Sequence, residues 1–270
     1  MKLRVVELLL VTTLPALFLA SGGIPPLRES LATLIAGTLA AGAANAFNMI
    51  IESDIDKLME RTAKRPIVNE LISTTQALYF AFTIATLSLT IFWFFTNPLA
   101  TALTSAAIVF YVFVYTVGLK RRTSQNIVWG GIAGCLPVLI GWAAITESLA
   151  WPAIWFFMVV FFWTPPHFWA LAIKYRDDYA AAGIPMLPVV APTKVVARQM
   201  WFHTIAMITT SFLTLFSAGL APWSYLATGL LGIAFAAQLR DPERNASRIF
   251  NGSITYLSLY SIVLVAAVFI

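Results

Sequence analysis

Asn48, Glu52 and Asp56 are residues whose types and spacing could do chemistry together. They stand four residues apart, so on an α-helix their side chains line up on nearly one face. Asn48 lies at the end of a long apolar run, where a polar amide is costly unless it is paired or functional. Two carboxylates and an amide at the end of a membrane helix suit a divalent metal ion, because such ions prefer oxygen ligands. This row predicts a metal site.

Basic residues recur near the predicted ends of the same apolar runs. Arg61 and Arg65 follow the row directly, Lys120 and Arg121 open a later basic run, and Lys174 ends another apolar segment. Guanidinium and ammonium groups bind multiply charged oxyanions such as a diphosphate. Metal ligands and anion-binding residues together predict a metal–diphosphate site at a membrane surface.

His167 is the third feature with chemical potential. It follows Pro165 and Pro166 and is flanked by tryptophan and phenylalanine. The two prolines are expected to break the helix inside the membrane, which is tolerated where backbone lines a cavity. His167 is then either a satisfied core residue or a general base, a cation stabiliser or a contact to a flat macrocycle. Asp177 and Asp178 follow at the predicted inner surface and could supply the second half of the metal site. The segment after them, 180–192, is expected to be a non-helical loop on the inner side.

The elements that position these residues follow from composition. The chain of 270 residues is 60% hydrophobic and only 11% charged, whereas soluble domains carry about 25% charged residues. Apolar runs of about 20 residues predict membrane spans. We therefore expect an all-α polytopic membrane protein whose nine transmembrane helices surround a central cavity open to the cytoplasmic side. The predicted spans are about 5–20, 31–51, 76–95, 99–117, 126–145, 150–172, 199–220, 221–239 and 251–270.

Charge distribution predicts the orientation. Placing the N-terminus in the cytoplasm puts all but one, Arg28, of the 17 Lys and Arg residues on the inner side, as the positive-inside rule requires. The basic balance then reflects topology, and we expect no nucleic-acid partner. The N-terminal run has no suitable cleavage site, and no Arg/Ser-rich transit peptide precedes it. These features favour a bacterial plasma membrane, with the active site toward the cytoplasm.

At these residues the sequence resembles the UbiA superfamily of intramembrane prenyltransferases and, within it, the branch that farnesylates haem. The superfamily motif Asn-x3-Asp-x3-Asp maps onto Asn48, Glu52 and Asp56, with Glu in the middle position. The branch is matched by longer blocks, and the resemblance covers nearly the whole chain as one domain, 1–270. The matching blocks are Met59-Glu-Arg61-Thr62…Arg65-Pro66, Lys120-Arg121…Thr123…Asn126, Trp163-Thr-Pro-Pro-His167-Phe-Trp169 and Asp177-Asp178-Tyr179…Gly183-Ile-Pro.

The resemblance implies transfer of a farnesyl group from farnesyl diphosphate to a vinyl group of haem B, with addition of water, giving haem O. It implies Mg²⁺ as the cofactor, the lipid bilayer as surroundings and the downstream haem A synthase as a possible partner. Two alternatives stay open: a prenyltransferase acting on an aromatic quinone precursor, and a membrane haem carrier without catalysis. The quinone branch carries a second Asp-x3-Asp, whereas Asp177 and Asp178 are adjacent here. A carrier has no need of the metal-type row.

Overall fold

The computed structural model describes residues 3–60 and 62–270, with side chains from residue 11 onward. Within these residues all regular structure is helical, which confirms the predicted fold class. The helices, numbered along the chain, are α1 (Leu3–Ser21), α2 (Leu27–Ile51), α3 (Ser53–Asp56), α4 (Thr74–Phe95), α5 (Pro98–Val109), η1 (Phe110–Leu119), α6 (Asn126–Gly130), α7 (Ile132–Thr146), α8 (Trp151–Lys174), α9 (Arg176–Ala181), α10 (Leu187–Val190), α11 (Thr193–Ser217), α12 (Pro222–Ala236), η2 (Ala237–Arg240) and α13 (Pro242–Phe269).

Seven of the described helical segments are long and apolar enough to cross a membrane. They begin at Leu27, Thr74, Pro98, Asn126, Trp151, Thr193 and Pro242. The two remaining predicted spans coincide with α1, whose described apolar part is Val11–Ser21, and with α12, which has 15 residues. The chain is a multi-pass membrane protein, and the count of nine spans stays a prediction.

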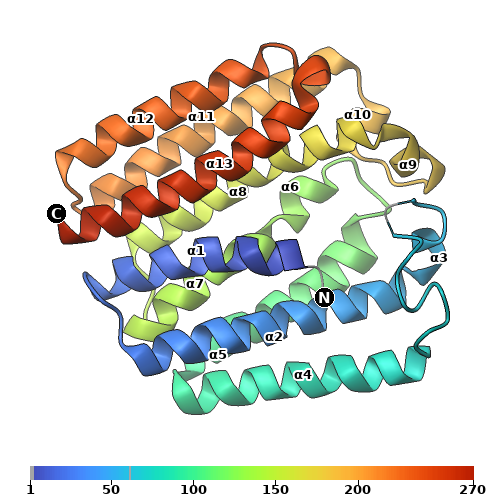
Figure 1. Cartoon of the computed structure of the whole chain (residues 1–270), viewed down its shortest axis with the longest axis horizontal. Helices are drawn as coiled ribbons and strands as arrows, with labels where there is room; N and C mark the ends of the chain where they lie inside the picture. Colours follow the sequence, from blue (N-terminus) through green and yellow to red (C-terminus); the bar gives the residue numbers. More distant parts are fainter. Residues whose placement is uncertain (1–2, 61) are drawn as a thin grey trace.

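The contacts between the long helices form a closed ring, and Figure 1 shows these helices lying side by side along the long axis of the molecule. Each packs on the next along the chain in the order α1, α2, α4, α5, α7, α8, α11, α12 and α13, and α13 returns to pack on α1. Small residues allow close approach at the tightest crossings. Ala36 of α2 is fully buried, and its carbonyl oxygen accepts a hydrogen bond of 2.7 Å from the hydroxyl of Ser88 on α4.

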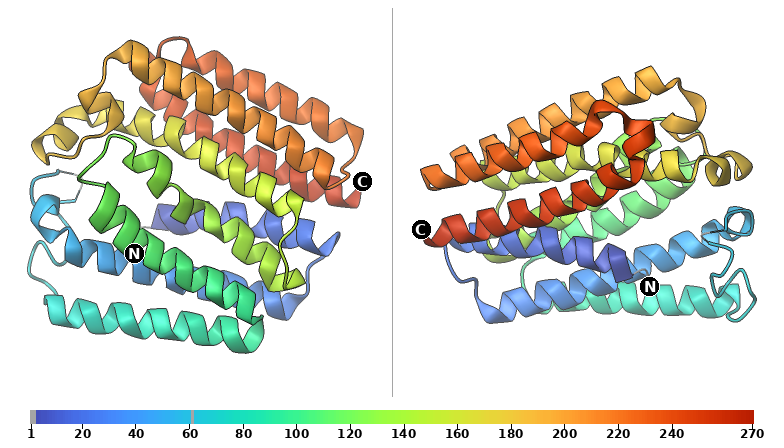
Figure 2. Two further views of the ribbon diagram at one scale, coloured as in Figure 1. Left: turned by 180° about the vertical axis from the view of Figure 1, so that it is seen from behind. Right: turned by 45° about the horizontal axis from the view of Figure 1, so that its top comes forward.

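The bundle has two chemically different ends. The short helices α3, α9 and α10 lie together at one end, on the right in Figure 1, and the C-terminus lies at the other. Both views in Figure 2 show the same separation. The short helices belong to segments that carry the basic residues singled out above. We call this the basic end.

Two local predictions about the chain are wrong. Pro165 and Pro166 do not break the membrane helix, because α8 runs without interruption from Trp151 to Lys174. Neighbouring helices can hold a proline-containing span together, and α8 packs on both α11 and α13. The segment after Asp178, expected to be non-helical, contains the end of α9 and the short helix α10.

Glycine allows a close approach at the junction of α6 and α7. A Cβ atom on Gly130 would lie 2.1 Å from Cδ2 of Tyr115, a residue of η1. The turns of η1 are wider than those of an α-helix, and the amide of Lys120 donates a hydrogen bond to the carbonyl of Tyr115, five residues back. Gly130 therefore lets the Tyr115 ring lie directly against the α6 backbone.

We predict that Gly130→Ala destabilises the protein by about 1–3 kcal/mol, the usual cost of overpacking. The matched control is Gly134→Ala on α7, where an added Cβ meets nothing within 4 Å and the higher helix propensity of alanine favours the variant. Thermal unfolding in detergent measures both. Equal unfolding temperatures for the two variants would contradict the close contact.

Candidate active site

Asn48, Glu52 and Asp56 form a continuous row at the basic end. Although α2 ends at Ile51, the amide of Glu52 donates to the carbonyl of Asn48 and the amide of Asp56 to that of Glu52, both at 2.9 Å. The four-residue spacing therefore survives the change from α2 to α3, and the side chains follow one another at successive turns. All three residues are almost fully buried, with at most 2% of their surface exposed.

Two cations from other segments neutralise the carboxylates. The ammonium Nζ of Lys120 lies 2.5 Å from Oε2 of Glu52, and Nη1 of Arg65 contacts Oδ2 of Asp56. Burial lowers the pKa of Lys120, and the carboxylate of Glu52 opposes that shift. Such pairs offset the large cost of removing a carboxylate from water.

Arg121 behaves differently from its neighbour Lys120. Its guanidinium forms a bidentate salt bridge with the carboxylate of Asp54, with N–O distances of 2.7 and 2.8 Å, and both side chains are substantially exposed. The hydrogen bond from Arg121 holds the pKa of Asp54 below its usual value. This pair lies at the surface of the site.

Three polar side chains that were not predicted as site residues support the row. Nδ2 of Asn48 donates to Oγ1 of Thr116 at 3.2 Å, and the hydroxyl of Thr62 donates to the carbonyl of Asp56 at 3.0 Å. Nδ2 of Asn126 donates to the carbonyl of Lys120 at 3.1 Å, which connects the turn that carries Lys120 to the start of α6. Thr62 and Asn126 lie in the blocks that match the family, whereas Thr116, a threonine near the end of an apolar helix, gave no distinct signal.

A cavity of about 220 Å³ lies beside the row. Polar groups of Asn48, Asp56, Arg65 and Lys120 line one part of it, and apolar and aromatic side chains line the rest. The latter include Met59, Tyr115, Trp163, Phe168, Leu171 and Met186, which come from loops and helices across the ring.

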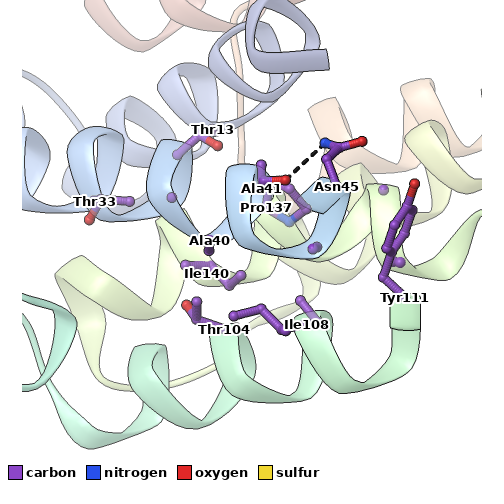
Figure 3. Close-up of a pocket in the computed structure, with 15 residues that line it drawn as sticks. Thr13, Thr33, Ala40, Ala41, Asn45, Thr104, Ile108, Tyr111, Pro137 and Ile140 are labelled. Atoms are coloured by element: carbon purple, nitrogen blue, oxygen red, sulfur yellow. Dashed lines mark hydrogen bonds between the residues drawn. The ribbon is translucent and has the colours of Figure 1, made fainter. Parts of the chain in front are cut away.

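A second cavity of about 150 Å³ lies between α1, α2, α5 and α7, and its walls are mainly apolar (Figure 3). Asn45, Tyr111 and Gly134 line both cavities, so the two adjoin. Nδ2 of Asn45 donates to the carbonyl of Ala41 at 2.8 Å, as drawn in Figure 3, which satisfies part of this amide inside the membrane.

His167 lies in an aromatic stack at the contact of α8 with α13. Its ring is stacked between Trp163 and Phe250, at centroid distances of 4.3 and 4.4 Å, and Phe168 lies edge-on at 5.0 Å. Nδ1 lies 2.8 Å from Oγ of Ser253. His167 is buried beside the cavity, which Trp163 and Phe168 line.

The remaining predicted site residues lie elsewhere or outside the described residues. Asp177 is exposed and Asp178 half-buried on α9, and neither lines the cavity. Lys174 is exposed, with Nζ 5.5 Å from the ring centroid of Tyr175. Arg61 falls outside the described residues. The roles of all four stay predictions.

The donor set fits an oxygen-preferring cation. Within the described residues, no three His, Cys, Asp or Glu side chains gather into a metal-binding group. The row nevertheless offers two carboxylates and one amide, and Oε1 of Glu52 is buried with no hydrogen-bond partner in that part of the chain. Mg²⁺ is usually held by one or two carboxylates together with substrate phosphates, so this set is sufficient when a diphosphate completes it.

Helices around a cavity, with buried carboxylates and cations at one end, define a membrane enzyme site for a charged substrate with an apolar tail. Residues 9–266 match the UbiA prenyltransferase family, and the chain belongs to this family. It is 51% identical to a protoheme IX farnesyltransferase of Frankia casuarinae, over 96% of this chain and 92% of the relative. The corresponding protein of Streptomyces avermitilis is 48% identical, over 96% and 88%.

Solved structures support the fold. A structure from a study of digeranylgeranylglyceryl phosphate synthase superposes with a TM-score of 0.79 at 14% identity, covering 98% of this chain and 99% of the other. A UbiA homolog from Archaeoglobus fulgidus bound to GPP and Mg²⁺ superposes with a TM-score of 0.70 at 16% identity, covering 98% of both chains.

We predict that the two neighbouring basic residues differ sharply in their effect on stability. Lys120→Met leaves the carboxylate of Glu52 buried and unpaired, which costs about 3–5 kcal/mol. Arg121→Met removes an exposed pair worth about 0–1 kcal/mol. Denaturation of both variants in detergent, without metal or substrate, measures the difference. Similar losses for both would show that the Glu52 pair is not buried in the protein.

Proposed function

We propose that this chain transfers the farnesyl group of farnesyl diphosphate to a vinyl group of haem B and so forms haem O. The observation that carries the proposal is the buried Asn48–Glu52–Asp56 row with Lys120 and Arg65 beside one cavity, in a chain about half identical to protoheme IX farnesyltransferases. The family and the charged site favour prenyl transfer, and the similarity over nearly the full length favours haem as the acceptor.

The row would hold Mg²⁺, with Asn48, Glu52 and Asp56 as ligands, and Asp177 or Asp178 is a further candidate from the sequence. When bound, Mg²⁺ supplies positive charge to the diphosphate oxygens as the allylic C–O bond breaks. Lys120 and Arg65 add fixed positive charge at the same place. Arg121 and Lys174 are outer candidates for the diphosphate, because neither of them lines the cavity. Arg61, outside the described residues, is a candidate from the sequence alone.

The farnesyl chain would extend into the adjoining apolar cavity past Asn45 and Tyr111 (Figure 3). The diphosphate leaves with the electron pair of the C–O bond, and the vinyl group of haem B attacks the allylic carbon. Water adds to the resulting cation on the vinyl side chain and loses a proton, which leaves a hydroxyethylfarnesyl group. Aromatic faces such as Trp163 and Tyr115 can stabilise positive charge in a water-poor cavity, and His167 would orient the macrocycle.

We further propose that the basic end faces the cytoplasm of a bacterial plasma membrane, with the N-terminus on the same side. The basic segments lie at this end, and the positive-inside rule assigns such an end to the cytoplasm. Association with haem A synthase stays a prediction.

The direct test is to incubate purified protein with haem B, farnesyl diphosphate and Mg²⁺ and to measure the mass of the haem. A gain of one farnesyl group and one water is expected. Prenylation of an aromatic acid in place of haem would move the protein to the quinone branch. Haem binding without transfer to either acceptor would identify a carrier.

We predict that Asp56→Asn lowers haem O formation by about 10²–10³-fold, the cost of losing one group that stabilises charge in the transition state. The matched control is Asp54→Asn, which removes a carboxylate two residues away that is exposed and paired with Arg121. The control should stay within about threefold of the unchanged protein, as expected for a surface group. Full activity of Asp56→Asn would refute the metal assignment.

Charge balance predicts that metal and diphosphate bind cooperatively. The pairs Glu52–Lys120 and Asp56–Arg65 are neutral together, so a dication alone or a diphosphate alone leaves uncompensated buried charge. We expect Mg²⁺ to tighten pyrophosphate binding by about 5–150-fold, a typical coupling between two ligands. Calorimetric titration of pyrophosphate with and without Mg²⁺ measures the coupling, and independent binding would contradict it.

A further inference from the structure

Ser253 connects the two aromatic residues that hold His167. Its backbone carbonyl accepts a hydrogen bond of 2.7 Å from Nε1 of Trp163, and its hydroxyl lies 2.8 Å from Nδ1 of His167. The same hydroxyl donates to the carbonyl of Phe250 at 2.7 Å. Ser253 is fully buried, so these contacts are not shared with water.

The direction of these bonds determines the tautomer of His167. A serine hydroxyl has one hydrogen, and the carbonyl of Phe250, which can only accept, takes it in the bond described above. The oxygen of Ser253 is then left to accept from Nδ1 of His167, which favours the proton on Nδ1. In a neutral imidazole the other nitrogen, Nε2, is then the acceptor with a free lone pair.

The surroundings of the ring indicate where that lone pair lies. Trp163 and Phe250 cover both ring faces, and Ser253 covers the Nδ1 edge. His167 keeps 7% of its surface exposed, and the edge that carries Nε2 is the one these three residues leave uncovered. Trp163 and Phe168, which contact His167, line the cavity.

We propose that Ser253 is a positioning residue that holds His167 as the Nδ1–H tautomer, so that Nε2 donates its lone pair to the iron of haem B. This inference rests on the proposed function, because it takes haem as the substrate. A neutral imidazole whose second nitrogen is fixed by a hydrogen bond is the usual form of a histidine metal ligand. No electron or proton is transferred in this binding step.

The tautomer can be measured without haem or activity. The chain has two histidines, so the nitrogen NMR spectrum of ¹⁵N-histidine-labelled protein in lipid contains two imidazoles. Nδ1 of His203 lies 2.8 Å from the carbonyl of Gln199, which can only accept, so His203 is also an Nδ1–H tautomer and serves as an internal reference. A His203→Asn variant assigns the signals.

We expect both imidazoles of the unchanged protein to show a protonated Nδ1 and an unprotonated Nε2. Ser253→Ala should move the proton of His167 toward Nε2 and leave the signals of His203 unchanged. The control Ser261→Ala removes another hydroxyl from α13, one that donates to the carbonyl of Val11, and should change neither imidazole. A His167 signal that is the same in Ser253→Ala and the unchanged protein would overturn the role of Ser253.

Haem binding tests the second half of the proposal. Titration of the unchanged protein with ferric haem B should give the absorption spectrum of a nitrogen-ligated haem, and His167→Ala should lose it. Ser253→Ala should bind haem about 10–100-fold more weakly, the usual cost of removing the partner of a metal-ligating histidine. Haem O formation by a protein whose haem shows no nitrogen ligand would overturn the iron contact and leave the proposed function intact.

Discussion

The structure depends on pairing two buried carboxylates with cations at the basic end of a membrane bundle. Glu52 and Asp56 are nearly fully buried, and an unpaired carboxylate in such surroundings costs several kcal/mol. Lys120, the partner of Glu52, comes from the turn after η1, 68 residues away along the chain, whereas Arg65, the partner of Asp56, comes from the loop after α3, nine residues away. Both loops must therefore fold over the end of α2, and this requirement brings Lys120 and Arg65 to the cavity.

The parts of the site that depend on local sequence were predictable. The spacing of Asn48, Glu52 and Asp56 predicted one row, and the backbone hydrogen bonds keep that row where α2 gives way to α3. Long apolar runs likewise predicted an all-helical membrane protein, because hydropathy and length alone decide whether a helix can span a bilayer. Span boundaries in the structure lie within a few residues of the predicted ones for most helices.

The parts that depend on tertiary packing were not predictable. Lys120 and Arg121 are adjacent in sequence, yet one pairs with buried Glu52 and the other with exposed Asp54. Both residues directly follow η1, whose wide turns depart from the α-helical spacing on which a sequence-based prediction relies. The prolines of α8 failed as helix breakers for a similar reason, since neighbouring helices can compensate for the missing hydrogen bonds.

The proposed reaction makes opposite demands on water at two successive stages, and the two adjoining cavities differ in polarity. Water must be kept from the allylic cation until the vinyl group has attacked, and one water must then add to the product cation. The charged groups lie toward the basic end, whereas the adjoining cavity between α1, α2, α5 and α7 has mainly apolar walls. The allylic cation forms at the carbon bonded to the diphosphate, so the farnesyl chain in the apolar cavity would keep water away from one side of that carbon, and Trp163 and Tyr115 of the first cavity would have to shield the rest. A haem ring held beside Trp163 and Phe168 would place its vinyl group nearer the polar part, where water can reach it after the new bond has formed.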